Sequence, residues 1–347
     1  MAARGSLFMR LVLLVLLATS CAFTTACSDR RGGGGGPPPP VGDGGGTDSG
    51  VTMRPDGSLP PGDMGCDKFD ILFVIDDSGS MSEEQANLAT NFPRFITELD
   101  AFRTVDGRPL DYRLGVTTTG RDTTTIIEFP PSFPVPPMSI VETGPAGELL
   151  MDSGCGMTRR WIERDDADVA GTFSCIAQVG TGGSSIEMPL HMLELSLTER
   201  VAEGTNAGFL REDALLAVVV LTDEDDCSRL DDPIHLMLPD ITMPAAAADV
   251  CDPTAPEIEP LTRFLAAYDG VKGDRGRWAM AVIAGPGPGS CTSSFGDAIE
   301  ASRLNEFLGL AGENTVFSSI CEGDLATALT DALTTFDAAC QSFPPLI

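Results

Sequence analysis

The sequence predicts an α/β fold, a doubly wound, mostly parallel six-stranded sheet with helices on both faces. Three observations lead to this prediction. Two runs of apolar residues, 71–75 and 214–221, are short and unbroken, as strands buried on both faces are, and the first is rich in β-branched residues. Amphipathic helical patterns alternate with such runs, which indicates crossover connections. Each run is followed by an aspartate, Asp76 or Asp223, at the place where open α/β sheets bind ligands.

The first 27 residues have the pattern of a bacterial export signal. Two arginines precede the strongly apolar segment 11–18, and small residues and cysteines follow it. The cysteines indicate the lipoprotein kind of signal, in which a cysteine becomes the lipidated first residue. We expect Cys27 to be lipidated, with Cys21 as the alternative. Removing both from the ten cysteines leaves eight, an even number that suits an oxidising compartment.

A linker and one large domain follow this signal. Residues 28–63 are rich in glycine and proline and offer little to bury, so we expect a flexible tether between a lipid anchor and the domain. Residues 64–343 are long enough for one α/β domain. Within them, the segment 120–179 breaks the strand–helix pattern with several prolines, and we interpret it as an insertion or a set of long loops.

The first buried strand ends in a run of oxygen-bearing side chains. Asp76, Ser78 and Ser80 follow it at every second position, and a helix begins at once. We expect Ser82 to cap this helix, with Gln85 as its capping-box partner. One face of the helix is apolar at helical spacing, through Leu88, Phe92, Phe95, Ile96 and Leu99.

The pattern Asp-x-Ser-x-Ser after a buried strand resembles the metal-ion-dependent adhesion site of von Willebrand factor type A domains, which include the integrin I domains. Two further loops match that family in order. At 182–186 the chain reads Gly-Gly-Ser-Ser-Ile where the family usually has Gly-Gly-Thr-Asp-Ile, so Ser184 takes the place of the threonine, with Thr181 as an alternative. The second buried strand ends in Thr222-Asp223, and Asp223 matches the aspartate of the family's third loop.

The resemblance implies a cation site and a way of using it. Its ligands would be Asp76, Ser78, Ser80, Ser184 and Asp223, and the ion would be Mg²⁺ or Mn²⁺, with Ca²⁺ as an alternative. Hydroxyl ligands leave the ion electrophilic, so an Asp or Glu side chain of a protein partner could complete its coordination. The implied function is adhesion or protein–protein interaction by a lipoprotein of the cell envelope.

The acidic residues after the third loop allow two interpretations. They could hold a second, Ca²⁺-like cation, or they could form an ordinary solvated loop, which is the commoner role of such a run. The residues concerned are Glu224, Asp225 and Asp226.

The remaining elements are predicted from the same patterns. We expect strands at 112–119, 278–284 and 315–320, and helices at about 190–200, 261–268, 301–310 and 324–340. Inside the insertion, we expect a short edge strand near 124–129 and a helix at 158–166.

The eight cysteines of the domain are expected to form disulfides rather than a metal site, because no Cys-x-x-Cys pair is present. Eight cysteines allow about 105 pairings, and the sequence alone cannot select one. Positions along the chain suggest one pair that ties the two ends of the domain, two that close loops and one that joins the ends of adjacent strands. These pairs are Cys66–Cys340, Cys155–Cys175, Cys227–Cys251 and Cys291–Cys321.

Charge and missing motifs restrict the function further. A net charge of −29 argues against binding to nucleic acid or to an anionic membrane through the protein surface. The sequence has no Gly-x-Ser-x-Gly elbow and no phosphate-binding Gly-x-x-x-x-Gly-Lys loop, so we do not expect an enzyme. Two alternatives remain open: a metal- and disulfide-stabilised envelope protein that binds through its insertion, and a metal-dependent phosphohydrolase.

Overall fold

The computed structural model describes residues 65–344, apart from 105, 239–249, 294–295 and 323–324. The predicted export signal 1–27, with Cys21 and Cys27, and the predicted linker 28–63 lie outside the described residues.

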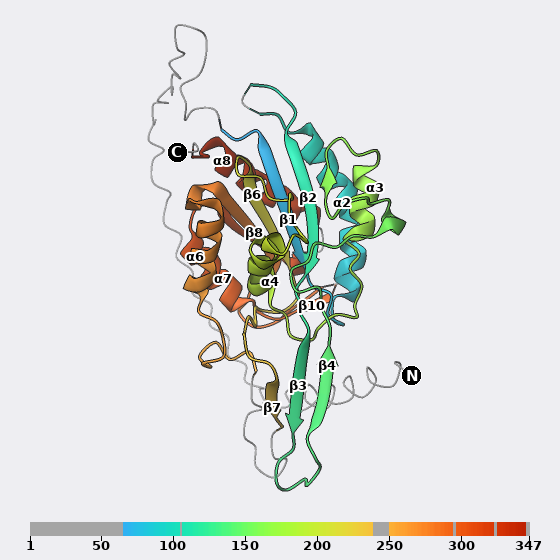
Figure 1. Ribbon diagram of the computed structural model, residues 1–347, viewed down its shortest axis with the longest axis vertical. Coiled ribbons are helices and arrows are strands. Elements are labelled where there is room, and N and C mark those ends of the chain that lie inside the picture. The colour runs from blue at the N-terminus through green and yellow to red at the C-terminus, as the bar shows by residue number, and fades with distance from the viewer. Residues whose placement is uncertain (1–64, 105, 239–249, 294–295, 323–324, 345–347) are drawn as a thin grey trace, which may run out of the picture. The chain divides into compact units, whose positions relative to one another are not determined.

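The core of the domain is a six-stranded sheet in the order β11-β8-β6-β1-β2-β5 (Figure 1). Neighbouring strands are parallel except for the short β5, which is antiparallel to β2. The chain builds outward from β1 to β2 and β5, then returns to the other side of β1 for β6, β8 and β11. The predicted doubly wound fold is confirmed. The strand bounds are β1 Lys68–Ile75, β2 Asp111–Thr118, β5 Ile162–Glu163, β6 Leu215–Leu221, β8 Trp278–Ala284 and β11 Thr315–Ser319.

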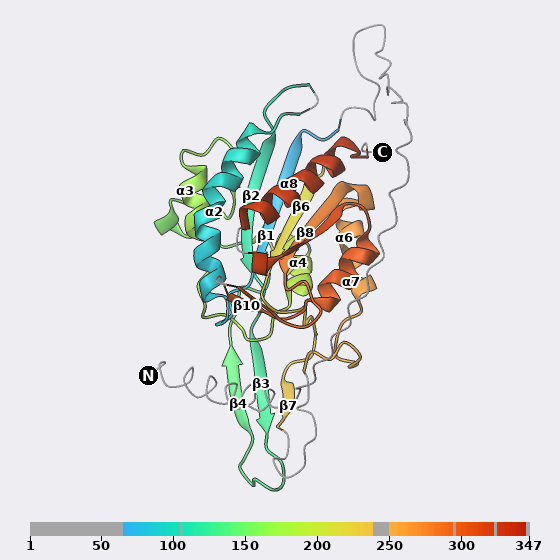
Figure 2. The same cartoon turned by 180° about the vertical axis from the view of Figure 1, so that it is seen from behind.

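Helices cover both faces of this sheet. One face carries α2, α3 and α8, and the other carries α4, α6 and α7 (Figures 1 and 2). The four-residue α5 follows α4 directly. The helix bounds are α2 Ser82–Ala101, α3 Val169–Ile176, α4 Pro189–Leu197, α5 Glu199–Ala202, α6 Leu261–Lys272, α7 Ser302–Ala311 and α8 Leu325–Gln341.

The apolar run of β1 supplies both halves of the core, because successive side chains of a strand point to opposite faces. Phe73 packs in the first half, with its ring against Phe92 of α2 and Phe173 of α3. Leu72 and Val74 point to the second half, beneath α4 and α6. The strand is therefore held rigidly on both sides up to its last residue, and it fixes the position of the loop that follows.

The structure corrects two predictions about helices. The helix predicted at 158–166 is wrong. There, Asp166 accepts hydrogen bonds from the Arg159 guanidinium and from the Glu163 backbone N–H, which folds the segment back on itself and allows only β5. The helix of this region is α3, and Asp168 caps it by accepting a hydrogen bond from Gly171 N at 2.9 Å.

The predicted capping box at the start of α2 is also wrong. The residue before the helix is Met81, without a side-chain cap, and the Ser82 hydroxyl donates instead to Glu83. Gln85 has a different role. Its amide donates to Asp76 O at 3.0 Å and to Gly180 O at 2.6 Å, so this side chain joins the loop after β1 to the loop that precedes α4.

Part of the insertion forms a separate three-stranded sheet in the order β4-β3-β7 (Figure 1). Its strands are β3 Thr123–Glu128, β4 Met138–Glu142 and β7 Ile234–Met237. The strand predicted near 124–129 is confirmed as β3, but the prediction of an edge strand is wrong. It is the middle strand between β4 and β7, and it pairs with them rather than with the central sheet. A hairpin of β9 (Cys291–Ser293) and β10 (Gly296–Ala298) precedes α7.

The predicted disulfides are confirmed as four pairs, Cys66–Cys340, Cys155–Cys175, Cys227–Cys251 and Cys291–Cys321. Such a set persists in an oxidising compartment, and it indicates an exported protein. Within the described ranges, no helix combines the length and the apolar character needed to cross a bilayer.

Candidate metal centre

The loops after β1 and β6 begin side by side at the carboxyl edge of the central sheet. The register pairs Ile75 with Leu221, the last residues of the two strands, and Asp76 N donates to Leu221 O at 2.9 Å. The chain adds strands on one side of β1 first and on the other side afterwards, so the connections after β1 and β6 leave in opposite directions. Asp76 and Asp223 therefore lie side by side at the carboxyl ends of the two strands.

A chain of hydrogen bonds joins four of the five predicted ligands. Asp76 Oδ1 accepts from Ser78 N at 2.7 Å, the hydroxyls of Ser78 and Ser80 lie 2.9 Å apart, and Ser80 Oγ donates to Asp223 Oδ1 at 3.3 Å. On its other side, Asp76 Oδ2 accepts from the Thr222 hydroxyl at 2.7 Å. We refer to Asp76, Ser78, Ser80 and Asp223 as the β1–β6 cluster. Five oxygen-bearing side chains, Thr222 included, thus converge at one place.

The two carboxylates of the β1–β6 cluster are buried without a basic partner. Asp76 is fully buried and Asp223 is 2% exposed, and in the described part of the chain neither forms a salt bridge. Burial raises the pKa of Asp76. Burial first, and then the charge of Asp76, raise the pKa of Asp223 to about 8. Without a counter-charge, acids with such raised pKa values hold a proton. The donor set of carboxylates and hydroxyls fits a hard cation such as Mg²⁺, which would take the place of that proton.

Ser184, the fifth predicted ligand, bonds within its own turn and not to the β1–β6 cluster. It is buried and lies beside Gly120, where a Cβ would be 3.0 Å from Ser184 Cβ. Its hydroxyl accepts from Ile186 N at 3.1 Å and donates to Ile186 O at 3.3 Å, so it closes its own turn. Among the residues described, no hydrogen bond joins it to the β1–β6 cluster. The alternative, Thr181, is exposed and is equally separate.

Asp77 lies next to the β1–β6 cluster but turns toward the second loop. Its backbone O accepts from Gly183 N at 2.7 Å, and a Cβ at Gly183 would lie 2.1 Å from Asp77 Cγ. Only glycine fits at that position. Burial and the charge of Asp76 raise the pKa of Asp77 to about 6. Gly183 therefore allows the second loop to pack directly on the first.

The three acids proposed for a second cation are not assembled for that purpose. Asp225 caps α7 by accepting from Arg303 N at 2.8 Å and Leu304 N at 3.1 Å. Asp226 is buried and accepts from Arg303 Nε at 2.8 Å, as well as from Leu190 N at 3.0 Å. Both carboxylates hold neighbouring elements in place, and only Glu224 of the three lacks such a role.

Sequence reasoning missed the partner of Glu224, which is Glu187. This glutamate is 2% exposed at the entrance to α4, its carboxyl interacts directly with that of Glu224, and its Oε1 has no hydrogen-bond partner among the described residues. A glutamate between apolar Ile186 and Met188 was the available signal. In the described part of the chain, no three His, Cys, Asp or Glu side chains are grouped to hold one metal ion.

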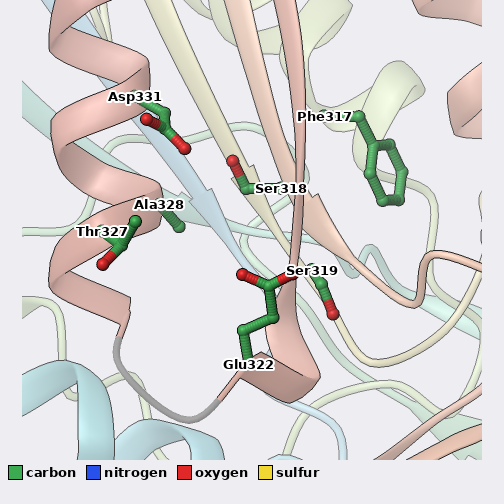
Figure 3. A pocket seen from close by; sticks show the side chains of 7 residues that line it. All are labelled: Phe317, Ser318, Ser319, Glu322, Thr327, Ala328 and Asp331. Atoms are coloured by element: carbon green, nitrogen blue, oxygen red, sulfur yellow. The ribbon is translucent and has the colours of Figure 1, made fainter. Parts of the chain in front are cut away.

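A separate pocket of about 130 Å³ lies between β11 and α8 (Figure 3). Hydroxyl groups and two acids line it, among them Ser318, Ser319, Glu322 and Asp331. Both acids are exposed, and β11 is the edge strand of the sheet, separated from β6 by β8. The pocket is therefore not part of the β1–β6 cluster.

Comparison with known proteins finds only distant similarity. No family model matches the sequence, and no curated protein matches it. Proximal thread matrix protein 1 of the mussel byssus is 11% identical, with a TM-score of 0.37 over 78% of this chain and 49% of that one. Another structure of that protein has its MIDAS motif occupied by zinc.

Two bacterial pilus adhesins show a similar level of likeness. SpaC from Lactobacillus rhamnosus GG is 10% identical, with a TM-score of 0.39 over 80% of this chain and 30% of that one. RrgA from Streptococcus pneumoniae is 10% identical, with a TM-score of 0.39 over 79% of this chain and 44% of that one. This chain spans less than half the length of each of these proteins. We therefore base the function on this chain's own residues.

Proposed function

We propose that this chain is an exported protein that holds Mg²⁺ or Mn²⁺ on the β1–β6 cluster and uses the ion to bind an acidic side chain of a partner protein. Asp76 and Asp223 would supply the charge, and Ser78 and Ser80 would supply neutral oxygens. Ser184 would join them through a turn of its hydroxyl away from Ile186. When bound, the cation supplies an electrophilic position for a carboxylate.

One observation carries this proposal: two buried carboxylates and two hydroxyls form a continuous hydrogen-bonded set, and no basic side chain among the described residues forms a salt bridge with it. An ordinary turn or cap after a strand needs one acid that accepts backbone N–H groups. It does not need a second buried acid from another loop. A hard divalent cation balances both charges and accepts oxygen ligands of either kind.

The burial of the β1–β6 cluster indicates where a partner would approach. Asp76 lies at the base and is fully buried, Ser78 is 3% exposed, and Ser80 is exposed to solvent. The outermost ligand is thus the one at the surface. A carboxylate from another protein would reach the ion from the Ser80 side. This fits a binding protein whose own net charge of −29 would otherwise repel acidic groups.

The anchoring part of the proposal concerns the N-terminal segment. We propose that lipidation at Cys27, or at Cys21, attaches the chain to the bacterial envelope, with residues 28–63 as the tether. Labelling with a fatty-acid probe in a bacterial host tests it. Label that is lost in Cys27→Ser and kept in Cys21→Ser supports Cys27. Label that is absent from the unaltered chain contradicts anchoring.

The binding function is tested with a carboxylate probe. The Mn²⁺-loaded chain is titrated with a short peptide that carries one glutamate, and the relaxation of water protons reports displacement of Mn²⁺-bound water. We expect the glutamate peptide to lower the relaxation rate, the matching glutamine peptide to have no effect, and Asp76→Ala to lose the response. An equal response to both peptides contradicts recognition of the carboxylate.

The β4-β3-β7 sheet is a second candidate surface for binding a partner. Its strands and the loop between β3 and β4 expose apolar side chains, with Val141 at 69% and Phe133 at 55% exposed. Exposed apolar patches are typical of interaction sites. If this sheet, and not the ion, supplies the affinity for a partner, then Val141→Ser with Phe133→Ser will abolish binding of that partner, while Asp76→Ala will leave it unchanged.

A further inference from the structure

Two further acids, Glu187 and Glu224, lie close to the β1–β6 cluster. Their carboxyls are hydrogen-bonded to each other, and the charge of Asp76 acts on both of them. Thr222 makes the connection, because its hydroxyl donates to Asp76 Oδ2 at 2.7 Å and accepts from Glu224 N at 3.0 Å. Asp76, Asp223 and Glu187 are buried, and Glu224 is half-buried. None of the four forms a salt bridge within the described ranges.

Glu187 provides a second and independent observation. It is 2% exposed, and its Oε1 has no hydrogen-bond partner among the described residues. The strongest charges acting on this carboxyl are those of Glu224 and Asp76, so it faces the acidic region rather than away from it. A buried carboxyl oxygen without a hydrogen-bond donor lowers the stability of the fold. We therefore expect a positively charged ligand to bind at this oxygen.

The position of Glu187 is fixed by the fold. Cys227 N donates to Glu187 O at 2.8 Å, and Met188 N donates to Thr119 O at 2.9 Å, so the backbone on both sides of the side chain is tied down. Cys227 in turn forms a disulfide with Cys251. The backbone that carries this carboxyl is therefore fixed against the loop that contains Glu224.

We propose that Glu187 and Glu224 form a second cation site behind the β1–β6 cluster, and that it takes a hard divalent ion such as Ca²⁺, Mg²⁺ or Mn²⁺. Two carboxylates suit such an ion, with the remaining ligands from neutral oxygens. The second ion neutralises the two acids that the first cannot reach. It replaces the site expected from Glu224, Asp225 and Asp226, whose two aspartates bind the start of α7 and Arg303.

Counting bound ions tests this inference separately from the proposed function. The purified full-length chain is stripped with a chelator and dialysed against MnCl₂ at pH 7.5, and bound Mn²⁺ per chain is measured by atomic emission. We expect two ions in the unaltered chain, one in Glu187→Gln, one in Glu224→Gln and one in Asp76→Ala. The exposed acid of α7 gives the matched control, Glu306→Gln, which keeps two.

The outcomes separate the two sites. One ion in the unaltered chain that is lost in Asp76→Ala and kept in Glu187→Gln overturns the second site and leaves the first. One ion that is kept in Asp76→Ala and lost in Glu187→Gln overturns the first site and supports the second. Thermal unfolding in chelator guards against a trivial result. Glu187→Gln is expected to melt no lower than the unaltered chain, because the amide keeps a polar group beside Glu224 and removes one buried acid. A folded variant that still binds two ions overturns the inference.

Discussion

Arg303 is the residue whose removal tests most directly how the third loop is held. Its guanidinium donates to Asp226 Oδ2 at 2.8 Å and also to Glu259 O. The side chains of Arg303 and Asp226 are 7% and 0% exposed. Asp226 accepts further from Ser228 Oγ at 2.6 Å, so the pair ties α7 to the loop that begins with Asp223.

The substitution Arg303→Met keeps most of the side-chain volume and leaves the Asp226 carboxylate buried without its counter-charge. Loss of one partner of a buried ion pair costs about 3–5 kcal/mol. We expect a loss near the middle of this range, about 4 kcal/mol, because the hydrogen bonds from Ser228 and Leu190 N still reach Asp226. The double variant with Asp226→Leu should recover part of the loss, since no lone charge then remains buried.

Unfolding in guanidinium chloride, followed by far-ultraviolet circular dichroism with and without Mg²⁺, measures this loss. A loss below about 1 kcal/mol for Arg303→Met would refute the structural role of the pair. The alternative, in which Asp226 binds a cation, makes an opposite prediction. Asp226→Asn would then release one bound Mn²⁺ ion while the stability of the metal-free chain stayed the same.

Thr222, the Cys66–Cys340 disulfide and His191 each allow a further prediction. Thr222→Val removes the hydroxyl that orients Asp76 Oδ2, and we expect Mn²⁺ to bind about tenfold more weakly in a calorimetric titration; unchanged affinity would contradict that role. Replacing Cys66 and Cys340 by serine removes a disulfide with a sequence separation of 274, and we expect it to lower the unfolding free energy by about 5 kcal/mol. Replacing Cys155 and Cys175, whose separation is 20, should lower it by about 3 kcal/mol. Equal losses in guanidinium unfolding would count against the loop-entropy explanation. Burial lowers the pKa of His191 from 6.5 to about 4. As the pH falls, the unfolded chain therefore binds a proton at this residue before the folded chain does. The stability that neutral His191 contributes above pH 6.5 is lost as the pH falls toward 4. We expect the unfolding free energy of the unaltered chain to fall by up to about 3 kcal/mol more than that of His191→Leu over this pH range. Parallel pH profiles of unfolding free energy for the two chains would refute this prediction.

The central sheet was predictable because its strands are buried on both faces. A strand such as 71–75 must be apolar at every position, and that pattern differs from helices and loops. The ends of the strands were predictable for the same reason, since the first acid after an apolar run marks the edge of the sheet. Asp76 and Asp223 therefore followed from the sequence together with the fold.

Other features depend on contacts between distant segments and leave little local trace. The β4-β3-β7 sheet pairs β3 with β7, more than 100 residues later, and its strands alternate weakly because neither face is buried. Gln85 has the spacing of a capping-box residue, yet it bonds to Gly180 in another loop. The acids after Asp223 look alike in the sequence, and only the position of Arg303 separates Asp226 from Glu224.

The cation at the β1–β6 cluster is tested most directly by calorimetric titration of Mg²⁺, Mn²⁺ and Ca²⁺ into the chain and into Asp76→Ala. Asp165→Ala is the matched control, because the Asp165 side chain is 96% exposed. We predict saturable binding in the unaltered chain and in the control, and the loss of one bound ion in Asp76→Ala. Titrations that are identical for all three chains would contradict a cation held by Asp76.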